Sequence, residues 1–404
     1  MSTATINNVL SDRINSLAES ATIGMAKKAR ELAAQGVSVI NLSFGEPDFQ
    51  TPQFIKDAAK KAIDEGHTFY TPVAGYPDLK QAIVSKLKRD NNLDYKPENI
   101  IVSTGAKQAI ANALMVLVNP GDEVIIYSPY WVSYSELVTL CEGKSVLIEG
   151  SIENDFKASI EQLKAAITDK TKVIMFSSPC NPTGSVFTNK ELEEIAAVVA
   201  ENPNIYVLAD EIYEHIYFGT EKLISIASFP AIKERVVTIN GVSKGFAMTG
   251  WRVGFMAAEK LIVDACDKLQ GQITSGTCSI AQKAAAAAFN GDLAPTIEMN
   301  KAFLRRRDLC FNLLNEIPGI KVNLPGGAFY FFIEVSSYFG KANGDFKITN
   351  AEDLCIYLLQ VAHVSTVTGE AFGAGDYIRM SFAASDENLT KAIAQIKEAL
   401  AKLA

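Results

Sequence analysis

Short runs of β-branched residues alternate with helical segments between residues 99 and 239, and this alternation leaves the chain few possible folds. In the segments between the runs, apolar residues recur at helical spacing, for example over 106–118 and 189–200. Because strands separated by helices pair in parallel, the pattern predicts an α/β fold whose mostly parallel sheet is covered by helices on both faces. The predicted strands are 99–103, 123–127, 144–148, 171–176, 204–209 and 236–239. Ligands of such sheets bind beyond the carboxyl ends of the strands.

The regions on either side of this pattern predict a second, smaller α+β unit. Before it, residues 12–36 favour a helix ending at Gly36, residues 37–42 a strand and residues 43–48 a loop. After it we expect a charged helix over 294–315, strands over 319–322, 328–333 and 377–382, and a closing helix over 388–403. The predicted division is therefore an N-terminal arm and first part of the small domain at 1–48, a large domain at 49–290, and a C-terminal small domain at 291–404.

Charge and cysteine usage narrow the class of partner. The formal net charge is −8 and no Lys/Arg block occurs, so we expect small-molecule substrates and no nucleic-acid partner. No apolar stretch reaches the roughly 18 to 20 residues of a membrane span, which predicts no membrane partner and a cytoplasmic location. Six scattered cysteines without a CxxC pair, and three histidines that never cluster with them, predict reduced core or structural thiols and no metal site.

Polar groups follow the predicted strands, and the first two suit a phosphate and a phenolate. Gly105 and Ala106 open a helix after the strand 99–103, so free backbone N–H groups and the helix dipole favour an anion there. Asn181 follows the strand 171–176 between two prolines, which hold its amide in a rigid turn. An ordinary helix cap and a plain Asn-Pro turn are the alternative interpretations.

The next two groups suit a ring nitrogen and an aldehyde. Asp210 directly follows the predicted buried strand 204–209, where a carboxylate needs a nearby cation to stay charged. The alternative interpretation is an aspartate that caps a helix. Tyr213 lies one helical turn further along the chain. Lys244 follows the strand 236–239 between Ser243 and Arg252. A desolvated lysine near other cations has a lowered pKa and can form a Schiff base, whereas a solvated lysine after a strand is the alternative. A phosphate, a phenolate oxygen, a ring nitrogen and an aldehyde are the four polar groups by which a protein can bind pyridoxal 5'-phosphate.

Residues 241–254, Asn181-Pro-Thr-Gly184 and Asp210-Glu-Ile-Tyr213 carry a family resemblance. The chain resembles the class I/II aminotransferases of the pyridoxal-phosphate fold-type I superfamily along nearly its full length. It is most similar to the subgroup of bacterial aspartate aminotransferases that also includes prephenate aminotransferases, and further support comes from residues 20–23, 45–49, 105–108 and 128–134. The resemblance implies a large domain with a seven-stranded sheet and a smaller α+β domain.

Roles at the cofactor are implied by matching these motifs. Lys244 would bind the aldehyde and carry a proton, Asp210 would keep the ring nitrogen protonated, and Tyr213 with Asn181 would bond the phenolate oxygen. Trp131 would stack on the ring. The residues implied at the phosphate or beside it are Gly105, Ala106, Lys107, Ser243 and Arg252. Tyr70 resembles a tyrosine that reaches the phosphate of the neighbouring subunit, which implies a homodimer with shared active sites.

The resemblance also implies a substrate site. Arg379 would clamp the α-carboxylate with help from the Gly45 backbone, and Lys107 would bind a distal carboxylate. Thr22 and Ile23 are expected to border this pocket, together with Trp131 and Asn181. The expected reaction is L-aspartate plus 2-oxoglutarate giving oxaloacetate and L-glutamate, by a ping-pong route through pyridoxamine phosphate.

Three alternative functions remain at this stage. A glutamate/aspartate-prephenate aminotransferase would share the same residues, and a β-lyase could use the same scaffold to release pyruvate and ammonia. A pyridoxal-phosphate-sensing transcription regulator would need a DNA-binding module, yet the segment before Gly45 carries no basic recognition helix.

Overall fold

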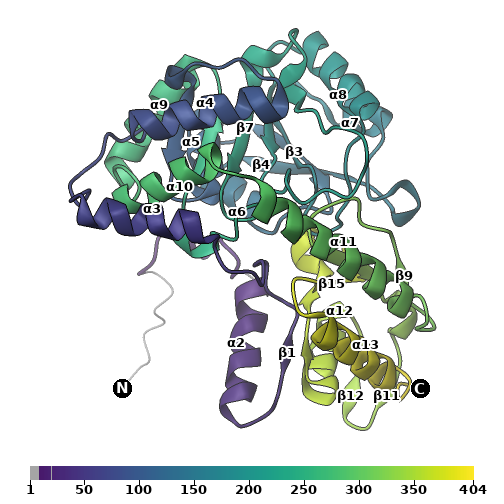
Figure 1. Cartoon of the computed structure of the whole chain (residues 1–404). Coiled ribbons are helices and arrows are strands. Elements are labelled where there is room, and N and C mark those ends of the chain that lie inside the picture. The colour runs from purple at the N-terminus through teal and green to yellow at the C-terminus, as the bar shows by residue number, and fades with distance from the viewer. Residues whose placement is uncertain (1–8, 20) are drawn as a thin grey trace, which may run out of the picture.

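The computed structural model describes residues 9–19 and 21–404. It contains a large sheet and a small sheet, each with its own helices and apolar core (Figure 1). The N-terminal helix α2 lies beside the C-terminal elements and not beside the large sheet. Chain segments from both ends therefore build the smaller unit. The domain boundaries at 48/49 and 290/291 stay a prediction.

The large sheet has seven strands in the order β2-β8-β7-β6-β5-β3-β4. Six strands share one direction, and β8 runs antiparallel to both of its neighbours. The strand bounds are β2 Ile100–Ser103, β3 Glu123–Ser128, β4 Lys144–Glu149, β5 Thr171–Ser177, β6 Tyr206–Asp210, β7 Val236–Gly241 and β8 Gly254–Ala257. All six strand runs from the sequence pattern are confirmed within a few residues. The pattern missed β8, because its sequence, Gly-Phe-Met-Ala, lacks the β-branched residues that marked the other strands.

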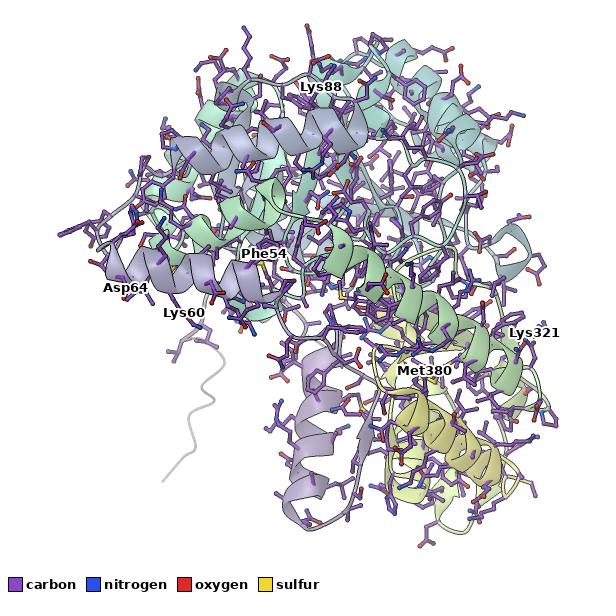
Figure 2. The ribbon with its side chains drawn as sticks, in the orientation of Figure 1. Phe54, Lys60, Asp64, Lys88, Lys321 and Met380 are labelled. Carbon is purple, nitrogen blue, oxygen red and sulfur yellow. The ribbon has the colours of Figure 1, made fainter. Side chains whose placement is uncertain are left out.

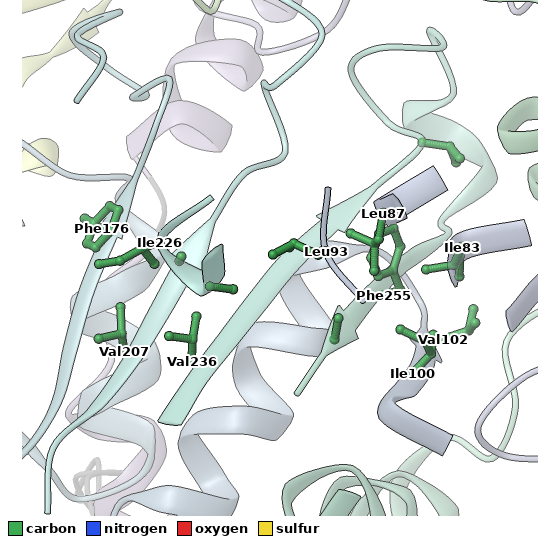
Figure 3. Packing of buried hydrophobic residues seen from close by; sticks show 14 of the residues in the cluster. Ile83, Leu87, Leu93, Ile100, Val102, Phe176, Val207, Ile226, Val236 and Phe255 are labelled. Carbon is green, nitrogen blue, oxygen red and sulfur yellow. The ribbon is translucent and has the colours of Figure 1, made fainter. Parts of the chain in front are cut away.

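Alternate residues of the same strands enter two different cores. Ile100 and Val102 of β2 pack on one face of the sheet, where Figure 3 shows them near Phe255, whereas Ile101 packs on the other face. Helices α3, α4, α7, α8 and α10 contribute to the first core, and α5, α6 and α9 to the second. Both faces are thus covered, which leaves the strand ends for function.

The small sheet is antiparallel, in the order β14-β15-β10-β9, and a two-stranded parallel sheet joins β1 to β13. Met25 and Ala29 of α2 enter the core of this unit with side chains from α11, α12 and α13. The small-unit strand bounds are β1 Ile40–Asn41, β9 Lys321–Val322, β10 Tyr330–Glu334, β11 Ala342–Asn343, β12 Phe346–Lys347, β13 Val364–Ser365, β14 Val367–Thr368 and β15 Tyr377–Ser381.

Helices and strands alternate from β2 to β6, whereas α3 and α4, and α9 to α11, follow one another with no strand between them. The bounds of the α-helices are α1 Asp12–Asn15, α2 Ala21–Ala34, α3 Gln53–Asp64, α4 Pro77–Asn91, α5 Ala106–Leu117, α6 Ser133–Leu140, α7 Ile160–Ala166, α8 Asn189–Glu201, α9 Lys260–Ile273, α10 Ser279–Asn290, α11 Ala294–Leu314, α12 Ala351–Tyr357 and α13 Asp386–Leu400. Charged side chains such as Lys60, Asp64 and Lys88 project from the outer surfaces of α3 and α4 (Figure 2).

Two details of the predicted secondary structure are wrong. The single helix over 12–36 is interrupted after α1, because the Ala18 N–H donates to the Glu136 carboxylate (2.8 Å) in place of a helical carbonyl. The strand over 37–42 shrinks to Ile40–Asn41, the only two residues of that run that pair with β13.

The cysteine and membrane expectations can also be compared with the structure. Cys266, Cys310 and Cys355 are buried, Cys141 and Cys180 are partly buried, and Cys278 is exposed. All six thiols are free. Across residues 9–19 and 21–404, no helix is long and apolar enough to cross a membrane.

Candidate active site

A cavity of about 580 Å³ lies where the carboxyl ends of the large-sheet strands face β15 and the N-terminal segment. Four cationic side chains and two carboxylates line it, so the cavity favours an anionic ligand. Thirteen of the residues expected at the site line this cavity: Thr22, Ile23, Gly45, Ala106, Lys107, Trp131, Asn181, Asp210, Tyr213, Ser243, Lys244, Arg252 and Arg379.

Lys244 lies three residues beyond the end of β7 and projects into this cavity. Its Nζ donates to the Gly45 carbonyl oxygen (2.5 Å) and lies 5.6 Å from the centre of the Tyr213 ring. Burial lowers the pKa of Lys244 to about 8, and the nearby guanidinium groups of Arg379 and Arg252 act in the same direction. A substantial share of the amine is therefore neutral, and nucleophilic, near neutral pH.

Asp210 is the last residue of β6, and its carboxylate is buried beneath the cavity. Tyr134 of α6 donates its hydroxyl to Oδ2 (2.7 Å), and the Ile212 N–H donates to Oδ1 (3.2 Å). Burial raises the pKa of Asp210 to about 6, while these hydrogen bonds oppose the rise. The protein therefore holds a carboxylate in an environment that disfavours its charge, which suits a cationic partner in the cavity.

An anion cradle lies at the start of α5. Gly105 has φ 82°, and a Cβ atom there would collide with the Arg252 guanidinium, so only glycine lets the arginine approach. Arg252 donates to the Thr249 carbonyl (2.9 Å), and Ser243 is buried at the cavity wall. The first N–H groups of α5 have no intrahelical acceptor, so the helix start and Arg252 together form a seat for a phosphate-sized anion.

Arg379 connects the small sheet with the turn that carries Asn181 and with the N-terminal segment that carries Ser43. It lies on β15, is 1% exposed, and donates to the Asn181 side-chain oxygen (3.0 Å) and the Ser43 carbonyl (2.7 Å). Its Nε has no hydrogen-bond partner within the described chain. Because Asn181 uses its oxygen to accept this bond, its amide nitrogen is the group left to donate toward the cavity.

The hydroxyl of Tyr213 is 2.7 Å from the hydroxyl of Tyr330 on β10, and both rings are buried. Burial raises the pKa of Tyr213 well above 10, so it stays a neutral phenol able to donate. Tyr330 also fixes Gly45, because a Cβ atom at position 45 would lie 2.6 Å from the Tyr330 oxygen.

The far wall of the cavity carries Lys107, whose Nζ lies 5.0 Å from the centre of the Trp131 ring. Partial burial lowers the pKa of Lys107, and the charge of Arg252 lowers it further. No carboxylate pairs with Lys107 in the part of the chain that the structure describes. Thr22 and Ile23, at the start of α2, complete this wall.

Comparison with known proteins identifies the family. Residues 37–396 match the model of the aminotransferase class I and II family. The chain belongs to the class I and II aminotransferases. Similar curated relatives of this aminotransferase include a bifunctional aspartate aminotransferase and glutamate/aspartate-prephenate aminotransferase from Petunia hybrida, 47% identical over 97% of this chain and 82% of the relative. An aspartate/prephenate aminotransferase from Nitrosomonas europaea is 44% identical over 97% of this chain and 99% of the relative.

Solved structures confirm the predicted fold type I of this aminotransferase. The aspartate aminotransferase of Rhizobium meliloti has a TM-score of 0.94 at 40% identity, covering 98% of this chain and 99% of its own. The Thermus thermophilus aspartate aminotransferase with maleate has a TM-score of 0.91 at 38% identity, covering 96% and 99%. The family implies dependence on pyridoxal phosphate.

Two residues expected at the site, Gly105 and Tyr70, do not line the cavity of this aminotransferase, and several residues that do line it were missed. Tyr70 is 99% exposed and does not line the cavity, so its expected contact would need a second subunit. Tyr134 lies in the segment 128–134, which supports the family resemblance, but the sequence assigned it no role. In the structure its hydroxyl donates to Asp210. Glu46 and Tyr330 also line the cavity; neither follows a strand of the large sheet, which is the signal that located Asn181, Asp210 and Lys244, and neither was given a role by the resemblance.

Proposed function

We propose that this chain is a pyridoxal-phosphate-dependent aspartate aminotransferase that exchanges amino groups between L-aspartate and 2-oxoglutarate. The observation that carries the proposal is one cavity in which an amine with a lowered pKa, a buried carboxylate and a helix-start anion seat lie together, with two further cations at Arg379 and Lys107. These groups match an aldehyde, a ring nitrogen, a phosphate and two substrate carboxylates.

The residues present fit the cofactor. When bound, pyridoxal phosphate supplies an aldehyde for amine exchange and a protonated ring that withdraws electrons from the substrate Cα. Asp210 would pair with the protonated ring nitrogen, since its buried carboxylate needs a cation, and the Asn181 amide and Tyr213 hydroxyl could donate to the phenolate oxygen. Ala106, Ser243 and Arg252 would hold the phosphate, and Trp131 would cover the ring.

The same residues divide the work on the substrate. Lys244 would hold the aldehyde of the cofactor, and its amine could move a proton at the substrate Cα, because a pKa of about 8 allows both proton states near neutral pH. Arg379 binds the α-carboxylate and sets the direction of the side chain, with Gly45 alongside. Tyr330, which is fully buried, forms part of the cavity wall beside Gly45.

Lys107 supports a dicarboxylic substrate. A cation at the first turn of α5 opposes the helix dipole, so an external carboxylate is the partner that would offset its position. The maleate bound by the Thermus aspartate aminotransferase is itself a dicarboxylate. Prephenate also carries two carboxylates, and both curated relatives include prephenate in their names, so a glutamate/aspartate-prephenate activity is the second candidate.

A substrate panel tests the proposal. Aspartate, glutamate, prephenate, phenylalanine and alanine are mixed one at a time with the cofactor-loaded protein, and the absorbance change of a single half-reaction is followed. We expect stoichiometric conversion with aspartate and glutamate. Sustained ammonia release without a keto-acid acceptor would instead indicate a β-lyase.

Variants at Lys107 test the substrate class. Lys107→Ala should raise the KM for aspartate about 10-fold or more, through loss of a charge-assisted hydrogen bond, and leave the KM for alanine nearly unchanged. Lys88→Ala, which removes an exposed lysine outside the cavity, is the matched control. Equal effects of Lys107→Ala on both substrates would show instead that Lys107 is a solvated lysine that does not bind the distal carboxylate.

The subunit arrangement is part of the proposal. Phe69 is 83% exposed and Tyr70 is 99% exposed, and two adjacent aromatic side chains in solvent are typical of an interface. We therefore expect a homodimer in which Tyr70 completes the partner's phosphate site, in the cytoplasm. Light scattering should give twice the chain mass, and Tyr70→Phe should weaken cofactor binding; a monomer with full activity would contradict this arrangement.

A further inference from the structure

Behind Asp210 lies a second, much smaller cavity that the proposed function does not use. Its volume is about 20 Å³, and its walls come from β3, from the end of β5, from the turn that follows β5 and from α6. Half of the twelve lining residues are aromatic, with Tyr130, Phe156, Phe176 and Phe187 among them, and Lys157 is the charged member of the wall. Tyr134, which donates to Asp210, belongs to the same wall.

Three hydroxyl groups in this wall are buried, and none makes a hydrogen bond of good geometry among residues 9–19 and 21–404, although Ser177 lies close to the Tyr134 hydroxyl and Ser185 lies close to the Asp155 carboxylate. They belong to Tyr127, Ser177 and Ser185, which are 6%, 7% and 5% exposed. Buried hydroxyls are nearly always hydrogen-bonded, and three such groups around one cavity need a common partner that can both donate and accept. A volume of roughly 10 to 15 Å³ is enough for one water molecule.

We propose that this cavity is a binding site for one structural water molecule, held by Tyr127, Ser177 and Ser185, that fixes Tyr134 and the Asn181 turn behind the active site. The cavity volume fits one water, and three partners match the usual number for a buried water. An apolar occupant would leave all three hydroxyls unpaired.

The water ties together the two strand ends on which the site depends. Ser177 is the residue of β5 paired with Asp210 of β6, and the Ser178 N–H donates to the Asp210 carbonyl (3.1 Å). Ser185 closes the turn that presents Asn181, because its carbonyl accepts from the Cys180 N–H (2.9 Å). One molecule bonded to both serines therefore limits movement of Asn181 relative to Asp210.

Tyr134 links this site to the charge on Asp210. A phenol that donates to a carboxylate stabilises the ionised form only while its hydroxyl points there, and packing around the ordered water keeps the Tyr134 ring in place. The other titratable groups around Asp210 are Lys244 after β7, Glu211 beside it and Tyr213 one turn on. Tyr127, Ser177 and Ser185 are thus positioning residues, and only this consequence for Asp210 rests on the proposed function.

A crystal structure of the wild-type protein at about 1.8 Å resolution tests the site directly. We expect one well-ordered density peak within hydrogen-bonding distance of at least two of Tyr127 Oη, Ser177 Oγ and Ser185 Oγ. An empty cavity, or one closed by side-chain movement, would overturn the proposal. This result does not depend on any enzymatic activity.

A variant pair tests the positioning role without the cofactor. For each cofactor-free protein and its Asp210→Asn counterpart, the difference in unfolding free energy is measured as a function of pH. The pH midpoint of that difference gives the pKa of Asp210. Tyr127→Phe should raise this midpoint by roughly 0.5 pH unit, because the support for the Tyr134 hydrogen bond weakens. Tyr95→Phe removes another buried, unpartnered tyrosine hydroxyl and should leave the midpoint unchanged. An unchanged midpoint in Tyr127→Phe, with the water present in the wild type, would overturn the positioning role.

Discussion

Replacing Asp210 by Asn should make the cofactor-free protein more stable while it cripples the proposed reaction. Asn has the same shape as Asp and can keep both neighbours, since its oxygen can accept from the Ile212 N–H and its amide can donate to the Tyr134 oxygen. The substitution therefore removes mainly the charge. A buried carboxylate without a cationic partner destabilises the folded protein until a bound ligand supplies a cation.

The size of this effect follows from the pKa of Asp210. Burial raises it from 3.8 to about 6, and a difference of about two pKa units at about 1.4 kcal/mol each corresponds to roughly 3 kcal/mol. The folded state binds more protons than the unfolded state between these two pKa values, so the stability of the wild type falls as pH rises from about 4 through about 6. Asp210→Asn removes that decline, and its advantage should be full above pH 7 and absent near pH 4.

Urea unfolding of the cofactor-free protein, followed by tryptophan fluorescence at pH 5 and pH 8, measures the prediction. Asp210→Asn should be up to about 3 kcal/mol more stable than the wild type at pH 8, with a clearly smaller gain at pH 5. Asp64→Asn is the control, since Asp64 lies at the exposed end of α3 (Figure 2). The cofactor should reverse the order of stability, because only Asp210 can pair with a protonated ring. No gain at pH 8, or an equal gain at both pH values, would refute the reasoning.

Three further outcomes test other parts of the site. The rate at which the cofactor-free protein combines with pyridoxal phosphate should rise with pH around a midpoint near 8, because burial lowers the pKa of Lys244, and stopped-flow absorbance showing a midpoint near 10 would contradict this. Arg379→Lys should reduce kcat/KM for aspartate by about 100-fold, since a lysine cannot bond two protein oxygens and a carboxylate in one plane; a loss below about threefold in steady-state assays would argue against the clamp. Gly105→Ala should weaken cofactor binding about 10-fold or more in a fluorescence titration, because the added Cβ displaces Arg252. Gly121→Ala, at a similar φ of 85° with no atom within 4 Å of its Cβ, should leave binding unchanged, and equal weakening by both would contradict the cradle.

Most of the large sheet and most of the cavity could be predicted because their signals are local. Each parallel strand is a short run of β-branched residues, and each of the key residues Asn181, Asp210 and Lys244 follows such a run within a few positions. The strand β8 escaped prediction because its sequence, Gly-Phe-Met-Ala, contains no β-branched residue. The break between α1 and α2 escaped for a different reason, since a side chain from α6 takes the Ala18 N–H.

The sequence by itself determined the fold class, the order of the strands along the chain and the kinds of chemical group at their ends, because these depend on neighbours within a few residues. Only the tertiary structure decided how those groups act on one another. It places Arg379 of β15 against Asn181, brings the Gly45 carbonyl to Lys244, and sets Tyr134 on Asp210. These contacts join residues between 76 and 199 positions apart. Burial, which shifts the pKa values of Lys244 and Asp210 toward each other, exists only once those segments have packed together.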